Sequence, residues 1–94
     1  MRRVLRYVIP LDDRTHDVAE GLPVLCATRN NHVNGPELWV EADCPDDFPV
    51  SGPEVRPVQA FGTGHVIPDG AEHLGSCIDG PFVWHLYDMS EVEA

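Results

Sequence analysis

Hydrophobic residues occur in short runs along this chain, and each run is bounded by residues that favour turns. The spacing of three to four that marks an amphipathic helix is nearly absent. The runs predict strands at residues 2–9, 15–19, 23–31, 37–43, 55–61, 73–78 and 82–88. We therefore expect an all-β fold, a small antiparallel β-sandwich or squat barrel of about six to seven short strands.

Two dipeptides predict the tight turns of hairpins. Asn34-Gly35 and Asp79-Gly80 each separate two β-rich runs. Both central residues of a type I′ turn need positive φ, which Asn, Asp and Gly tolerate best. Each dipeptide therefore predicts a hairpin that joins the runs on its two sides. Pro57 lies inside a run and lacks a backbone N–H, so it predicts an edge strand or a bulge.

Alternation within two strands separates a core face from a second face. The core candidates are Leu38, Val40 and Ala42 in one strand and Phe82, Trp84 and Leu86 in the other. His85 alternates with the second set, so we expect it to face away from Trp84. Few of the other strands are one-sided, which favours a domain in which some strands are covered on both faces.

The length of the chain allows one modest core. The 94 residues include nine prolines and eight glycines, which interrupt any long helix. Apolar residues make up 43% of the chain, which fits a folded domain. We expect a single β-domain at residues 1–88, followed by an acidic, frayed tail at 89–94.

Charge limits the choice of partner. Sixteen acidic residues stand against six arginines, and the formal net charge is −10. Such a surface repels phosphate groups, so we expect no direct binding to nucleic acid. The same charge leaves open a second function, that of an acidic nucleic-acid mimic that blocks a DNA-binding protein.

The N-terminal stretch and the cysteines predict the compartment. The stretch MRRVLRYVIPLDD is basic, but Arg6 and Pro10 interrupt its apolar residues, so it does not fit a signal peptide. No run is long enough for a transmembrane helix. Cys26, Cys44 and Cys77 lack motif spacing, which favours free thiols in a reducing compartment. We therefore expect a cytoplasmic protein that binds no membrane.

A glycine loop near the C-terminus, FGTGHVIPDG, ends in His65 and raises the question of a ligand site. Phosphate loops lead into a helix, whereas Pro68 follows here at once, so we expect a structural turn with His65 hydrogen-bonded locally. The alternative is an enzyme or a phosphate-ligand binder built on His65 and His85. It requires both imidazoles in one pocket.

Metal and cofactor chemistry have little support in the sequence. His65, His73, Cys77 and His85 lack the paired spacing of zinc ligands. No nucleophile elbow, P-loop or paired-carboxylate motif is present. We therefore expect no metal, no cofactor and no catalytic activity.

Trp39 stands on the nominally polar face of its strand, where an aromatic side chain favours contact with a protein. The candidate interaction residues are Trp39, Glu41, Asp43, Asp46, Asp47 and Phe48. The alternative is structural, with the loop at 45–53 covering this face through Phe48 packed on Trp39.

The C-terminal half resembles a family of short uncharacterised proteins from tailed phages of actinobacteria. The matching motifs are GTGH-x-I-P-D at residues 62–69 and the final VWH strand, with RYVIPL and ELWVEAD earlier in the chain. The resemblance implies a viral source and no particular activity. We therefore expect a small non-catalytic bacteriophage accessory protein that binds a host or phage protein in the host cytoplasm. A homodimer and a structural component of the virion are further possibilities.

Overall fold

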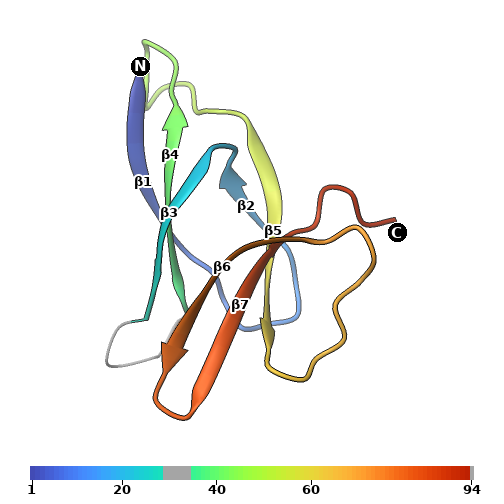
Figure 1. Cartoon of the computed structure of the whole chain (residues 1–94). Coiled ribbons are helices and arrows are strands. Elements are labelled where there is room, and N and C mark those ends of the chain that lie inside the picture. Colours follow the sequence, from blue (N-terminus) through green and yellow to red (C-terminus); the bar gives the residue numbers. More distant parts are fainter. Residues whose placement is uncertain (29–34, 94) are drawn as a thin grey trace.

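The computed structural model describes residues 1–28 and 35–93, which form seven β-strands and no α-helix. This part of the chain accordingly has no helix that could cross a membrane. The strands are β1 (Arg2–Val8), β2 (His16–Ala19), β3 (Leu22–Ala27), β4 (Glu37–Asp43), β5 (Val55–Gly62), β6 (Glu72–Asp79) and β7 (Phe82–Asp88) (Figure 1). The predicted all-β fold is confirmed.

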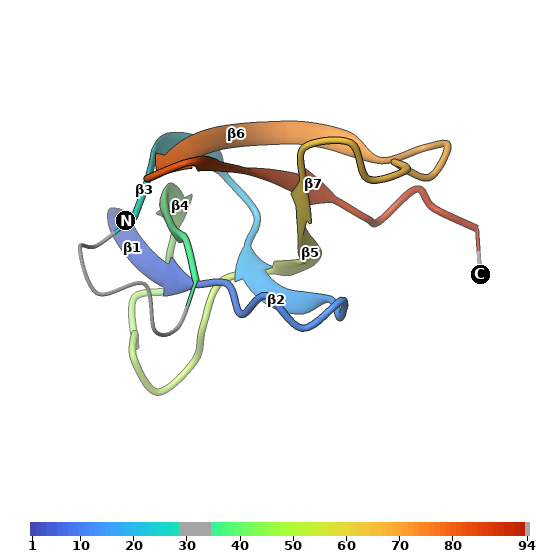
Figure 2. The ribbon, with the colours of Figure 1, turned by 90° about the horizontal axis from the view of Figure 1, so that it is seen from below.

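The strands form two antiparallel sheets. One sheet has the order β1-β4-β3 and the other the order β2-β5-β7-β6. Seen from below, β6 and β7 pass over β1 and β4 (Figure 2). The edge strands β3 and β6 contact each other. The molecule is therefore a small sandwich, as the sequence predicted.

The core lies between the sheets and contains mainly aliphatic side chains. Its fully buried residues are Ile9, Val18, Ala19, Leu38, Val40, Val58 and Leu86. Burying a side chain of this kind stabilises the fold by about 1.5–3 kcal/mol. Leu38, Val40 and Leu86 were predicted as core residues and are fully buried. The same prediction for Phe82 is wrong, because Phe82 lies at the tip of its hairpin and is 58% exposed.

The hairpin of β6 and β7 is confirmed, but its turn is one residue later than predicted. Asp79 pairs with Phe82, so Gly80 and Pro81 form the loop. The proline ring holds φ negative, which excludes a type I′ turn at its second position. Gly80, with φ +56°, fits the first position of a type II′ turn.

The other predicted hairpin is confirmed in its pairing. β3 runs antiparallel to β4, and the pair nearest the connection is Ala27 with Glu37. Asn34 and the end of the predicted strand 23–31 lie outside the described residues, so the predicted Asn34-Gly35 turn stays a prediction.

The prediction that Pro57 marks an edge strand or a bulge is wrong. Its strand, β5, lies between β2 and β7. Pro57 pairs with Asp17 on one side, while the ladder with β7 begins only at Val58. The carbonyl of Pro57 accepts a hydrogen bond from Met89 N–H (2.8 Å). The missing N–H therefore faces the end of β7, beyond the paired residues of the β5–β7 ladder.

The segment after β7 makes contacts, although the sequence predicted a frayed end. Ser90 N–H donates to the Asp88 carboxylate (2.8 Å), and Val92 N–H donates to the Met89 carbonyl (3.2 Å). The backbone of Glu91 lies against Gly70 in the loop between β5 and β6. Residues 89–93 are thus attached to the domain.

Candidate functional site

The outer face of the three-stranded sheet gathers residues from all three of its strands around Trp39. Residues directly opposite in an antiparallel ladder share a face, and Trp39 is opposite Arg6 on one side and Leu25 on the other. The same register adds the neighbouring outward positions. We define the Trp39 face as Arg2, Val4, Arg6, Val8, Leu22, Leu25, Glu37, Trp39 and Glu41.

This face exposes apolar side chains that are not part of the core. Leu22 is 63% exposed, Val4 56%, Leu25 54% and Val8 39%, while Trp39 is half-buried among them. Single exposed apolar residues are ordinary on protein surfaces, but a contiguous group marks a contact surface. The alternate positions of β4, Leu38 and Val40, supply the core instead.

The charged residues of the Trp39 face are paired within it. Arg6 lies 3.2 Å from Glu37, and Arg2 lies 3.1 Å from Glu41. The Arg6 guanidinium is also 6.0 Å from the centre of the Trp39 ring, within range of a cation–π contact. This face therefore balances its own charges on a chain whose net charge is −10.

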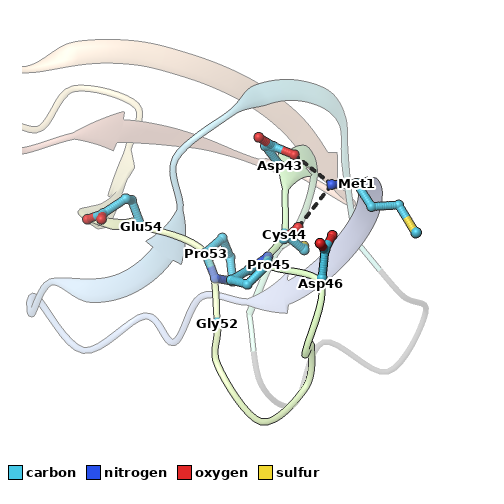
Figure 3. A pocket seen from close by; sticks show the side chains of 8 residues that line it. All are labelled: Met1, Asp43, Cys44, Pro45, Asp46, Gly52, Pro53 and Glu54. Atoms are coloured by element: carbon cyan, nitrogen blue, oxygen red, sulfur yellow. Dashed lines mark hydrogen bonds and ion pairs between the residues drawn. The ribbon is translucent and has the colours of Figure 1, made fainter.

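The loop between β4 and β5 adds acidic groups at one end of the Trp39 face. It borders a pocket of about 420 Å³, lined by Met1, Asp43, Cys44, Pro45, Asp46, Gly52, Pro53 and Glu54 (Figure 3). The amino group of Met1 donates to Asp43 (2.9 Å) and to the carbonyl of Cys44 (3.0 Å). Asp46 and Asp47 are exposed on the loop, where Asp47 accepts a hydrogen bond from Ser51 (2.8 Å).

Phe48 lies apart from Trp39, on the other side of the sheet. Its ring contacts the guanidinium of Arg3, at 5.1 Å. Arg3 is opposite Ala42 in the ladder, so its side chain leaves β1 on the side away from Trp39. The expectation that Phe48 packs on Trp39 is therefore wrong, and Phe48 does not belong to the Trp39 face.

His65 lies in the predicted structural turn. The backbone N–H of His65 donates to the carbonyl of Gly62 (3.2 Å), and the backbone N–H of Gly62 donates to the ring nitrogen Nδ1 of His65 (3.1 Å). Gly64 has φ +90°, as this turn requires. His65 also borders a pocket of about 470 Å³ beside Phe82 and Trp84, whose rings stack with centroids 5.9 Å apart.

His85 faces away from Trp84, as predicted, and does not line the pocket beside His65. Its Nδ1 is 2.7 Å from Ser76 Oγ, and its Nε2 is 3.0 Å from Thr63 Oγ1. His73 Nε2 lies 2.8 Å from the same serine oxygen. We call this group, His73, Ser76, His85 and Thr63, the serine–histidine row. The structure thus connects His85 to His73, through the hydroxyl of Ser76, rather than to His65.

Two of the three cysteines meet where the sheets come together. Cys26 on β3 pairs with core residue Leu38, and Cys77 on β6 pairs with Trp84, so both thiols point inward. Burial raises the pKa of both thiols, and each is within hydrogen-bonding reach of the other. Cys77 and His73 leave β6 on opposite faces. Among residues 1–28 and 35–93, no three His, Cys, Asp or Glu side chains are gathered as metal ligands would be.

Sequence reasoning missed Leu22, Leu25 and Ser76. Leu22 and Leu25 join the Trp39 face because a register shift between Pro23 and Leu25 turns both outward. Ser76 reaches His85 because β6 also shifts register, between His73 and Gly75. Strict alternation cannot show such a shift.

Comparison with known proteins gives one match. The model of a family described as Domain of unknown function (DUF7352) matches residues 1–94. No curated protein and no solved structure matches the chain.

Proposed function

We propose that this chain, which belongs to the DUF7352 family, binds a protein partner through its Trp39 face and performs no chemistry there. The observation that carries the proposal is the exposure of Leu22, Leu25 and Val4 around a half-buried tryptophan. Exposed apolar side chains on this face keep apolar surface in water, and a partner that covers them gains the corresponding hydrophobic free energy.

The composition of this face suits a protein rather than a small ligand. Tryptophan and arginine are the residues most often found at the centres of protein interfaces, and here Arg6 stacks near Trp39. Its two salt bridges leave no unpaired arginine to be desolvated. The face presents an aromatic anchor with aliphatic neighbours, which a complementary apolar patch would cover.

The acidic loop favours a partner with basic residues beside its apolar patch. Asp46 and Asp47 project from the loop next to the end of β4. Exposed charges of this kind steer association and raise its rate, and their effect falls with ionic strength. We therefore expect association that is rapid at low salt and slower at high salt.

The source of the partner follows from the resemblance of the C-terminal motifs to short phage proteins. A phage accessory protein would meet its partner, a host or phage protein, in the host cytoplasm. This assignment of the source is independent of the binding face. The presence or absence of the chain in purified virions tests the separate hypothesis that it is a structural component of the virion.

The test is photo-crosslinking in an actinobacterial host lysate from two exposed apolar positions. A benzoylphenylalanine at Leu25 lies on the Trp39 face, and one at Ile78, which is 73% exposed on the other sheet, is the matched control. We expect one main crosslinked protein from position 25 and not from position 78. Trp39→Ala should weaken that complex at least about tenfold, as expected for an interface anchor.

Charge reversal separates the contribution of the loop. The double variant Asp46→Lys/Asp47→Lys should associate more slowly than wild type at low salt. At high salt the two rates should be similar, because screening removes electrostatic steering from wild type and variant alike. Circular dichroism should show that all variants remain folded. Equal crosslinking from positions 25 and 78, or a complex that Trp39→Ala leaves unchanged, would contradict the proposed face.

A further inference from the structure

The serine–histidine row lies on the outer face of the four-stranded sheet, away from the Trp39 face. Ser76 comes from β6, His85 from β7, and Thr63 from the turn after β5. His73 completes the row from the start of β6. Each of the three side-chain contacts in the row is 2.7–3.0 Å long, so each is a hydrogen bond by distance.

Thr63 Oγ1 lies 3.0 Å from His85 Nε2 and 3.5 Å from the carbonyl oxygen of Val83. Thr63 can therefore accept a hydrogen bond from His85 Nε2–H while its own hydroxyl turns toward that carbonyl. A neutral imidazole with its proton on Nε2 has a bare Nδ1, which accepts the Ser76 proton. Having donated its one proton, Ser76 Oγ accepts from His73 Nε2–H.

We propose that Ser76 is a nucleophile, with His85 as its general base, that takes the acyl group of an activated ester. A serine hydroxyl whose proton points at an imidazole nitrogen 2.7 Å away has the geometry of a nucleophile–base pair. In the tautomer with its proton on Nε2, His85 donates to Thr63 Oγ1 and presents a bare Nδ1 to the Ser76 hydroxyl. Thr63 is accordingly a positioning residue.

The step balances within the row and the ester. Ser76 Oγ forms a bond to the carbonyl carbon while its proton moves to His85 Nδ1. The bond from that carbon to the leaving oxygen then breaks, and the leaving alcohol takes the proton from His85. Water, activated by the same nitrogen, releases the acid and restores Ser76.

His73 supplies a donor for the negative charge that develops. Its Nε2 is 2.8 Å from Ser76 Oγ in the resting row. An oxyanion on the attacked carbon would lie next to that oxygen, so the same N–H can turn to it with little movement. Tyr87 supports His73 from the side, with ring centroids 5.3 Å apart in an edge-on arrangement.

The surroundings of the row fix the class of ester. On one side, Ile78 and Val83 pair directly across β6 and β7 and offer an aliphatic surface. On the other, Phe61 meets Tyr87 edge-on, with centroids 5.7 Å apart. The row itself contributes no carboxylate. A small, uncharged ester with an apolar or aromatic leaving group fits this surface best.

The experiment combines a fluorophosphonate probe with hydrolysis of p-nitrophenyl acetate by the full chain. We expect one labelled site, identified as Ser76 by peptide mass spectrometry, and no label on Ser51, an exposed serine beside Asp47 that serves as an internal control. Ser76→Ala should abolish labelling and the ester hydrolysis above background. His85→Gln should lower the labelling rate by about 100-fold or more, as loss of a general base does.

Two further variants distinguish a reactive row from a merely structural one. His73→Leu should slow ester hydrolysis by about 10- to 100-fold, and His73→Gln, which keeps an N–H donor, should recover part of that loss. Crosslinking from position 25 should be unchanged in Ser76→Ala. A negative result for the nucleophile is therefore distinguishable from a negative result for the proposed binding function. Equal labelling of Ser51 and Ser76, or no labelling of Ser76 above background, would overturn the proposal.

Discussion

Gly64 and Gly70 have nearly the same backbone conformation in very different surroundings. Their φ angles are +90° and +89°, which side chains other than glycine rarely adopt. A Cβ on Gly64 would meet nothing within 4 Å, whereas a Cβ on Gly70 would collide with the backbone oxygen of Glu91. The pair therefore separates the effect of dihedral strain from that of the contact with the segment after β7.

We predict that Gly64→Ala lowers the free energy of unfolding by about 1 kcal/mol, the cost of a left-handed alanine. Gly70→Ala should lower it by about 2 kcal/mol or more, because the alanine must also displace residues 89–93. Gly52→Ala, with ordinary φ and open space around it, should stay within about 0.5 kcal/mol of wild type. Urea denaturation measures all three, and equal losses for Gly64→Ala and Gly70→Ala would show that the segment moves freely.

At the scale of elements, strands were easier to predict from the sequence than their partners. The bounds of β4 and β7 match the prediction because alternation and flanking turns define each strand locally. The Gly80-Pro81 turn and the central place of Pro57 depend on which residue faces which across a ladder. His85 is connected through Ser76 to His73 instead of His65 because β6 shifts register between His73 and Gly75. Tertiary packing sets such shifts, so the sequence alone does not reveal them.

Cys26 of β3 and Cys77 of β6, which lie where the two sheets meet, make the stability of the fold depend on pH. Burial raises the pKa of Cys26 and Cys77 above the usual thiol range near 8.5. Above that pH the unfolded chain releases thiol protons that the folded chain retains, so unfolding becomes more favourable. We predict that the free energy of unfolding falls between about pH 8 and pH 9.5.

The measurement is urea denaturation at several pH values in a reducing buffer. The chain has no lysine, so few other groups titrate in this window. A Cys26→Ala/Cys77→Ala variant should show a flatter dependence on pH than wild type. The same slope in both proteins would mean that the two thiols do not cause the loss.

For the whole molecule, the sequence predicted the architecture and the excess of negative charge, whereas it could not place that charge on the surface. The 16 acidic residues outnumber the six arginines. Arg2, Arg6 and Arg56 are in ion pairs with Glu41, Glu37 and Asp88. Repulsion within a chain whose net charge is −10 opposes the compact state.

We therefore predict that salt stabilises this protein. Raising NaCl from about 0.02 M to about 0.5 M shortens the range over which charges repel, and the free energy of unfolding should rise by roughly 1 kcal/mol. Thermal or urea denaturation at each salt concentration checks this. A fall in stability with salt would mean that the salt bridges outweigh the repulsion.

The two outer faces of the sandwich belong to one small body, with Cα extents of 41 × 34 × 19 Å. Anything held on the Trp39 face and anything bonded to Ser76 are therefore kept within a few nanometres of each other. Confinement to that volume corresponds to an effective concentration on the order of millimolar. Two molecules that meet rarely in dilute solution would, once each occupies one face, encounter each other as if both were abundant.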